Sequence, residues 1–370
     1  MNNIMRWLDS VTDMDSRQQV KVHHLMKDII GIVFFALLAN ANEWIEIYYF
    51  AQAKEKFLRK YLELPNGIPS HDTIQRVMAI VPPEYLQEFR KRWDEVMSGR
   101  QGERIKRILG IDGKTQRGNG NVNQKANHIV SAVDNNGLCI GERLISDKSN
   151  EITAIPELLA QLNIKGCIIT TDAMGCQTKI AETITRRLAD YVLALKKNQG
   201  TLYDDVKLYF DDTEFLSHCE YKKTIEKARG CIEIREYWQT NDISWLSQKG
   251  DWRGLKTIAM TRNTIIKNDE TTTDVRYFIS SLALDVAEIA RAIRGHWMVE
   301  SYHWHLDVTF REDGNHTLDK AAAYNLNILK KMALNTLKLL DLGVKNISIK
   351  GKRFMLGLIF EDSIEALMSM

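Results

Sequence analysis

The chain has 370 residues, 44% hydrophobic and 26% charged, which excludes extended disorder and fibrous repeats. Its 50 Lys and Arg residues nearly balance 48 Asp and Glu residues, so bulk basicity is no argument for a nucleic-acid partner. Five Cys without a C-x-x-C pair exclude a zinc ribbon and a disulfide framework, and they indicate a cytoplasmic location. The longest uncharged apolar run, residues 29–39, is too short to span a bilayer, so we expect no membrane partner.

The first hundred residues have a helical pattern interrupted by turns. We expect helices over residues 28–41, 43–62 and 84–97. A turn rich in Pro and Gly follows the second helix and ends at the pair Asp72–Thr73, which has the residue types of a helix N-cap. Residues 1–100 are therefore expected to form a helical N-terminal domain.

The pattern changes near Ile105, where short β-rich runs separated by Gly and Asn turns begin. The runs RILGID, HIVSAVD and LCIGERLIS predict an antiparallel meander. After them we expect a helix over 150–162, the strand GCIITTD, the helix QTKIAETITRRLA and the strand DYVLALKK. This order predicts an α/β fold, with a mixed sheet flanked by helices. A second β-rich block over about 206–280 and long helices over 287–310 and 321–340 follow.

Two aspartates end apolar strands and are followed at once by small residues. They are Asp112 in RILGIDGKT and Asp172 in GCIITTDAMG. An acid at the tip of a buried strand lies at a sheet edge, where the backbone leaves room for a ligand. For either residue alone, a turn or helix-capping role is the commoner explanation. Two such strands in one sheet weaken that alternative without removing it.

The helix RAIRGHWMVESYHWHLDVTFRED carries an acidic and imidazole stripe. At about 100° per residue, His296, Glu300, His303 and Asp307 share one face. Apolar and aromatic residues flank the stripe: Trp297, Val299, Tyr302, Trp304, Leu306 and Phe310. A carboxylate there is expected to be desolvated, which is costly unless it binds a cation. Core histidines with a buried ion pair to Arg294 explain the pattern equally well.

Three carboxylates from two strand tips and a helix, without a thiol ligand, favour Mg²⁺, with Mn²⁺ as the second choice. Such a site suits phosphoryl transfer, in which metal ions activate the nucleophile and stabilise the leaving oxygen. The zinc-hydrolase motif H-E-x-x-H is absent, although Glu300 between His296 and His303 leaves a zinc site open.

Basic residues concentrate in two segments despite the low net charge. Ten Lys or Arg residues and four acids lie between Arg90 and Lys125. Seven Lys or Arg residues and one acid lie between Leu326 and Arg353. Basic density beside a phosphoryl-transfer site is what binding to DNA phosphates requires. For the C-terminal segment alone, a solvated helix face is the better explanation.

Several blocks together resemble a known family. They are LPNGIPSHDTIQRV, IDGKTQRG, KSNEITAIPELLAQLNIKGCIITTDAMGCQ, ALKKNQG, RGHWMVESYHWHLDVTFRED and NLNILKKMALNTLK. In this order they are similar to the H-repeat-associated, ISAs-type transposases of bacterial insertion sequences, over roughly residues 15–340. The resemblance implies an RNase H-like core with a D-D-E triad of Asp112, Asp172 and Glu300 that holds Mg²⁺.

The same resemblance implies a domain plan and a DNA partner. The expected units are a DNA-binding domain (1–100), the RNase H-like core (101–205 and 286–340), a β-rich insertion (206–285) and a basic C-terminal tail (341–370). Double-stranded DNA is the expected partner, both terminal inverted repeats and target, bound by a homodimer near the nucleoid. Residues in matching blocks are expected to bind DNA or support the site: Lys114, Arg117, Lys196, Asn198, Gln199, Arg294, His296 and Trp297.

Three positions depart from the family pattern. Lys197 replaces a Gly, Ser301 replaces an Asn, and Cys231 replaces an Arg in an H-G-R-x-E element that here begins at Arg229. An Arg at position 231 could hold a phosphate, which Cys cannot. The leading hypothesis is a DDE transposase that cuts at the element ends and joins the 3′-hydroxyls to target DNA. An inactive relic that only binds DNA, or a nuclease that cuts without joining, remain the alternatives.

Overall fold

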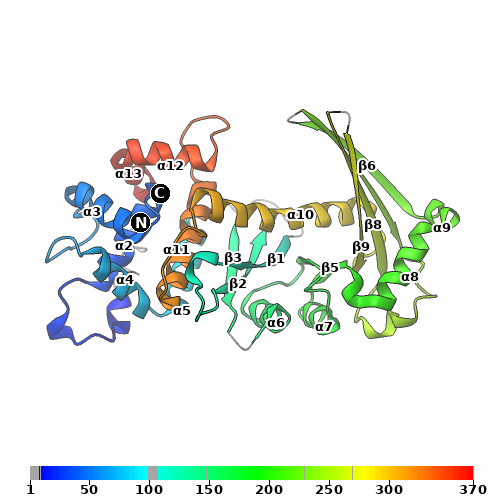
Figure 1. The fold of residues 1–370 in the computed structure, drawn as a ribbon, viewed down its shortest axis with the longest axis horizontal. Coiled ribbons are helices and arrows are strands. Elements are labelled where there is room, and N and C mark those ends of the chain that lie inside the picture. Colours follow the sequence, from blue (N-terminus) through cyan, green and yellow to red (C-terminus); the bar gives the residue numbers. More distant parts are fainter. Residues whose placement is uncertain are drawn as a thin grey trace.

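The computed structural model describes residue 8 and residues 10–98, 107–146, 149–228, 230–268 and 270–369. Figure 1 shows an elongated molecule, with helices from both ends of the chain at one end, a sheet in the middle and long strands at the other end. The expected α/β fold with a mixed sheet and a helical N-terminal region is confirmed.

One mixed sheet runs through most of the molecule in the order β3-β2-β1-β4-β5-β9-β8-β7-β6. The strands are β1 Ile108–Thr115, β2 His128–Asp134, β3 Cys139–Leu144, β4 Ile168–Thr171, β5 Asp190–Leu195, β6 Glu220–Ala228, β7 Cys231–Thr240, β8 Thr257–Lys267 and β9 Glu270–Ser280. The first three form the expected antiparallel meander, and β4 and β5 join β1 in parallel. Three antiparallel strands followed by two parallel ones make the core of the sheet RNase H-like.

The β-rich block expected over about 206–280 begins later and is not separate from the core. Two helices come first, α8 (Gly200–Asp211) and α9 (Thr213–Ser217), so the strands begin only at Glu220. The last strand of the block, β9, pairs antiparallel with β5, which makes β6–β9 an extension of the core sheet. The β-rich block was expected from about 206, although Leu202, Val206 and Tyr209 form a buried helical stripe at its start.

Helices cover both faces of the core strands. On one face lie α6 (Glu151–Gln161) and α7 (Thr178–Arg186), packed on Leu109, Ile111 and Val130. On the other face α10 (Val286–Trp304) crosses the strands, as Figure 1 shows, and ends in a π-helical turn at His305–Thr309. Alternate residues of a strand point to opposite faces of the sheet, so a single short strand contributes side chains to the hydrophobic core on each face.

The helical end of the molecule combines the two ends of the chain around α11. Its helices are α2 Met26–Leu38, α3 Trp44–Leu58, α4 His71–Ile80, α5 Pro83–Ser98, α11 Lys320–Leu339, α12 Ile349–Leu358 and α13 Phe360–Ser369. Helix α11 packs against α2, α4 and α5, and α12 packs against α2 and α11. The expected cap at Asp72–Thr73 is wrong by two residues: Ser70 is the N-cap of α4, and its hydroxyl accepts from the Thr73 amide.

The C-terminal basic segment is a solvated face only in part, because three of its seven cations are buried whereas Lys345 and Lys350 are exposed. Lys330, Lys331 and Arg353 are each 1% exposed. Arg353 donates to the carbonyl oxygens of Leu37 and Thr309, and so ties α12 to α2 and to the end of α10. Periodicity missed this burial because long cations rarely enter a core unless they find acceptors there.

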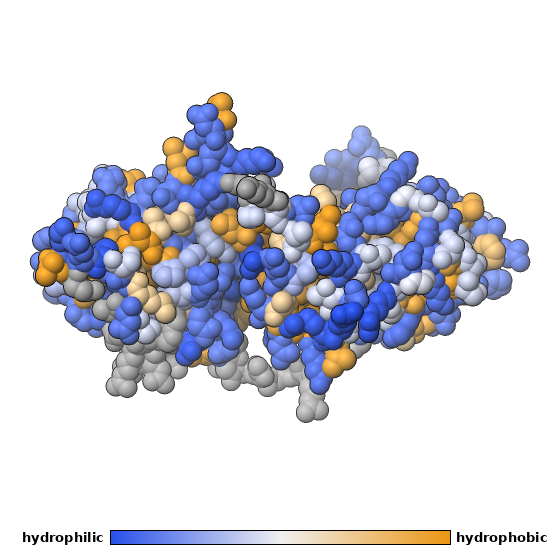
Figure 2. Space-filling model, turned by 90° about the horizontal axis from the view of Figure 1, so that it is seen from below, coloured by the Kyte–Doolittle hydropathy of each residue, from blue (hydrophilic) through white to orange (hydrophobic). Residues whose placement is uncertain are grey.

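No helix in the described part of the chain is long and apolar enough to cross a membrane. Figure 2 shows the molecule from below, where polar residues dominate and apolar residues are scattered in small groups.

Candidate active site

Asp112 and Asp172 lie side by side because their strands are parallel neighbours. Ile111 of β1 pairs with Thr171 of β4, so each aspartate is the next residue along its strand. The two carboxylates therefore lie side by side where the pairing of β1 with β4 stops. The expectation that Asp112 ends its strand is wrong, because β1 continues to Thr115 in its pairing with β2. The loop after β4 holds Asp172, whose Oδ1 accepts from the backbone amides of Met174 and Gly175 at 3.0 and 3.2 Å.

The residue that completes this acidic cluster is Glu151. Carboxylate oxygens of Asp112, Glu151 and Asp172 all lie within 4.8 Å of one another. Glu151 is the first residue of α6, beside its N-cap Asn150. The sequence analysis missed it. The signal available was an acid in the first turn of the helix after the third strand, which usually only complements the helix dipole.

Glu300 faces the same cavity from α10 without joining the cluster. A cavity of about 780 Å³ is lined by Asp112, Asp172 and Glu300 together. Glu300 is exposed, so the expected desolvation of this carboxylate is wrong. The other stripe residues do face protein. His303 is buried, and its Nδ1 lies 3.4 Å from the Asp112 carboxylate.

The environment pushes the pKa values of the two aspartates apart. Burial alone would raise the pKa of Asp112, but the hydrogen bond to His303 and the nearby His296 bring it below its ordinary value. Burial raises the pKa of Asp172, helped by the charges of Asp112 and Glu151 and opposed by the Gly175 amide. Adjacent carboxylates with opposite shifts are typical of a functional site.

The environment of His296 favours the neutral form of its imidazole. Burial lowers the pKa of its imidazole, although Asp112 and Glu300 oppose the shift. Its Nδ1 lies 3.0 Å from the Thr170 hydroxyl on β4. The imidazole therefore anchors α10 to the strand that ends at Asp172.

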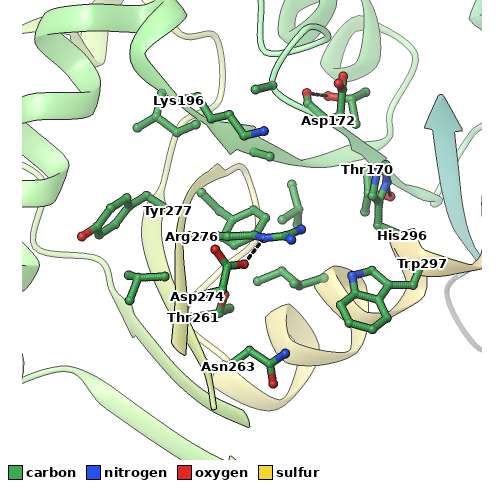
Figure 3. Close-up of a pocket in the computed structure, with 18 of the residues that line it drawn as sticks. Thr170, Asp172, Lys196, Thr261, Asn263, Asp274, Arg276, Tyr277, His296 and Trp297 are labelled. Atoms are coloured by element: carbon green, nitrogen blue, oxygen red, sulfur yellow. Dashed lines mark hydrogen bonds and ion pairs between the residues drawn. The ribbon is translucent and has the colours of Figure 1, made fainter. Parts of the chain in front are cut away.

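The cavity continues between α10 and the strands of the extension. Arg235 of β7, Arg262 of β8 and Arg276 of β9 line it, opposite Arg294. Figure 3 shows Lys196 and Arg276 reaching into this space, with His296 and Trp297 on the α10 side. Trp297 is contacted by two guanidinium groups, Arg294 at 4.6 Å and Arg235 at 5.9 Å from its ring centre. We call these cavity-lining cations, Lys196, Lys197, Arg235, Arg262, Arg276 and Arg294, the basic groove.

The sequence analysis named Lys196 and Arg294 and missed the three arginines of the extension. Each is a single charge within an alternating strand, so no basic run marks them. The groove forms only because β9 pairs with β5 and brings the extension beside α10.

Two further predicted DNA-binding residues, Asn198 and Gln199, brace the Asp172 loop. Asn198 donates to the carbonyl oxygen of Ala173 at 2.7 Å, and Gln199 donates to that of Cys176 at 2.8 Å. They follow β5, the strand next to β4, and the structure therefore gives them a supporting position.

The remaining basic residues of the 90–125 segment are dispersed. Lys114 is held by Asp307, Glu312 and Asp313, at 2.6, 3.4 and 3.1 Å. Arg117 is exposed, beside Asp313. Arg90 is buried and paired with Glu142. Arg100, Arg104 and Lys106 lie outside the described residues, as does Arg229.

The acidic cluster suits a hard divalent cation. It offers only carboxylate oxygens, the ligands that Mg²⁺ and Mn²⁺ prefer over thiolate or imidazole. Gly113 leaves the space that the cluster occupies, since a Cβ there would lie 2.3 Å from Glu151 Oε1. The residues present therefore fit such an ion.

The strand order, Asp112 within β1 and Asp172 directly after β4 define an RNase H-like protein with a carboxylate site. The chain belongs to the DDE transposases. Residues 103–336 match the family described as Transposase DDE domain, and residues 6–94 match the one described as DDE_Tnp_1-associated. The family expected from the sequence blocks is confirmed.

Relatives agree over most of the chain. YncI of Escherichia coli O157:H7, described as a transposase, is 39% identical over 334 residues, 88% of this chain and 85% of its own length. YhhI of E. coli K12, described as an H repeat-associated transposase, is 38% identical over 87% of each chain. YbfD of the same strain, described in the same way, is 42% identical over 60% of this chain and 88% of its own length.

Proposed function

We propose that this protein cuts the phosphodiester bonds at the ends of its own insertion sequence and joins the freed 3′-hydroxyls to target DNA. Asp112, Asp172 and Glu300 are the catalytic carboxylates in this proposal. The observation that carries it is their common cavity, where two adjacent parallel strands and α10 bring the three acids together. The family supports the reaction class, since a DDE transposase acts on DNA.

The chain's own residues prepare the site for a divalent ion. Asp112 stays ionised beside His303, and the Met174 and Gly175 amides fix the orientation of Asp172. The chemistry that Mg²⁺ or Mn²⁺ supplies when bound is activation of a water or 3′-hydroxyl and stabilisation of the leaving oxygen. Glu300 is exposed and therefore accessible to a scissile phosphate that enters the cavity.

The basic groove is the proposed path of the DNA backbone to these acids. Its cations line the same cavity as the carboxylates, and neutralised phosphates supply most non-specific affinity. Lys114, Arg117, His296 and Trp297 remain proposed contacts or supports, and Asn198 and Gln199 proposed supports of the Asp172 loop. We further propose that the helices of residues 1–100 contribute to recognition of the element ends, and that a dimer pairs two ends at the nucleoid in the cytoplasm.

The test is nicking of plasmid DNA that carries the native flanking repeats. The wild type should nick at the repeat ends with Mg²⁺ or Mn²⁺ and not with EDTA, and Glu300→Gln should not nick. Glu288→Gln, on the same helix but outside the cavity lining, is the matched control and should nick normally. Normal nicking by Glu300→Gln would refute the assignment of the third carboxylate.

Two further outcomes separate the alternatives. Nicking without joining of 3′-ends to a target plasmid would indicate a nuclease. Salt-sensitive binding to the repeats without nicking would indicate an inactive relic, and Cys231→Arg would then be the variant to test for recovered activity.

A further inference from the structure

The described carboxylates around Asp112 include one that the D-D-E pattern does not contain. Glu151, and not Glu300, supplies the third oxygen within 4.8 Å of the two aspartates. Among the residues that the structure describes, only imidazoles pair with these three acids: His303 with Asp112 and His128 with Glu151. Three carboxylates held together without a Lys or Arg partner in the described part of the chain repel one another, and a divalent cation relieves that repulsion.

Glu151 is held in place by a chain of two hydrogen bonds. His128 Nε2 lies 2.6 Å from Glu151 Oε1, and its Nδ1 lies 2.7 Å from the Thr115 hydroxyl. Because an ionised carboxylate only accepts, Nε2 donates to Glu151, and Nδ1 shares the second hydrogen bond with the Thr115 hydroxyl. Thr115 and His128 are cross-strand partners in β1 and β2, so the strand that carries Asp112 also orients Glu151. Metal-ligating groups are commonly fixed by such outer partners.

Gly113 shows that the approach of Glu151 to β1 depends on a missing side chain. A Cβ at this position would lie 2.3 Å from Glu151 Oε1 and 2.5 Å from His128 Nε2. Any other residue after Asp112 would displace the pair. The small residue that follows the strand-tip aspartate therefore makes room for another acid of the cluster.

We propose that Glu151 is a fourth carboxylate of the active site and binds the divalent cation with Asp112 and Asp172 before DNA arrives. Glu300, which faces the cavity from α10, then contributes mainly when DNA is bound. This inference rests on the metal-dependent function proposed above. It assigns Glu151 a role in metal affinity that can be measured without any reaction.

The experiment is a Mn²⁺ titration of the full chain without DNA, followed by the electron paramagnetic resonance signal of free Mn²⁺. Glu151→Gln should raise the dissociation constant about tenfold or more, as expected for a lost ligand. Glu300→Gln should change it less than about twofold. Glu157→Gln is the matched control, since Glu157 lies on the same helix, pairs with Arg143 and is 55% exposed. It should bind Mn²⁺ like the wild type.

A second variant separates lost ligation from lost folding. Gly113→Ala keeps every carboxylate but crowds Glu151, so it should weaken Mn²⁺ binding in the same direction while the circular dichroism spectrum stays unchanged. Wild-type affinity in a folded Glu151→Gln protein would overturn the inference, as would a larger loss from Glu300→Gln. If Asp112→Asn, like Glu151→Gln, bound Mn²⁺ with wild-type affinity, the proposed metal-dependent function would be refuted as well. If Asp112→Asn lost Mn²⁺ affinity and Glu151→Gln did not, only the role of Glu151 would be overturned.

Discussion

Two clusters of charged residues lie along the strands β1–β3, and their charges are compensated in different ways. Around Asp112 of β1, three carboxylates gather with only imidazoles as partners among the described residues. Between α5, β3 and α11, Arg90, Glu142 and Lys331 are at most 3% exposed at their side chains, yet each cation pairs with the glutamate.

The two clusters differ in whether their charges have oppositely charged partners, and this difference separates a cluster that stabilises the fold from one that is suited to bind a ligand. In the buried cluster, burial alone would raise the pKa of Glu142, but Arg90 and Lys331 bring it below its ordinary value, so each of these three charges has an opposite charge beside it. In the acidic cluster, burial and neighbouring acids raise the pKa of Asp172, so the negative charge is left for a ligand. Balanced charges hold elements together, whereas an excess of one sign indicates a binding site.

The largest expected effect is on the acidic cluster. Asp112→Asn and Asp172→Asn should each lower the rate of metal-dependent nicking by about 10³-fold or more, because each removes a ligand at the reacting centre. Neither should lower the melting temperature, since each relieves repulsion within the cluster. Nicking rates and thermal melts without metal check both parts. A large drop in melting temperature would show instead that the aspartate stabilises the fold, as the buried cluster of Arg90, Glu142 and Lys331 does.

The same contrast explains what the sequence could predict. Asp112 and Asp172 were predictable as neighbours because each follows a short apolar run, and the parallel pairing of β1 with β4 aligns these runs up to Ile111 and Thr171. That β1 continues past Asp112 to Thr115 was not predicted. Glu151 was not, because its approach depends on how the start of α6 packs against Gly113. Its acidic character alone indicates only a favourable helix start.

The basic residues show a similar limit. Lys331 and Arg353 lie in a run that counts as basic, but they are buried and bonded. Arg262 and Arg276 lie in no run, and the pairing of β9 with β5 brings them to the cavity. The sequence shows only how charges are spaced along the chain, whereas the function depends on which of them the folded sheet brings to the cavity.

On the balanced side, Glu142→Gln should destabilise the fold. It leaves Arg90 and Lys331 buried without their main partner, which costs about 3–5 kcal/mol of unfolding free energy. Urea denaturation measures the loss. The neighbouring Arg143→Gln is the control: Arg143 is exposed and paired with Glu157, so its loss should cost less than about 1 kcal/mol. Equal effects of the two variants would contradict the distinction between buried and exposed pairs.

Asp94, at the edge of the balanced cluster, predicts a pH dependence. Burial raises its pKa to about 7, although Arg90 and Asn335 oppose the shift. The folded state therefore holds a proton that the unfolded state releases near pH 4, and the stability from Asp94 falls as pH rises from about 4 to 7. Asp94→Asn should remove this fall and gain about 2–3 kcal/mol on the wild type between pH 5 and pH 8. Urea denaturation at both pH values tests it, and parallel pH profiles would contradict the raised pKa.

The smallest expected effect concerns the cations of the basic groove. Arg262→Gln should weaken DNA binding severalfold and reduce the slope of log affinity against log salt by about 1, because one phosphate contact is lost. Arg186→Gln is the matched control: Arg186 is exposed on α7, on the opposite face of the sheet from α10, and pairs with Glu182. Fluorescence anisotropy with labelled repeat DNA at several salt concentrations measures both variants. An unchanged slope for Arg262→Gln would remove this arginine from the DNA path, and an equal change for Arg186→Gln would show that affinity follows total charge and not the position of the basic groove.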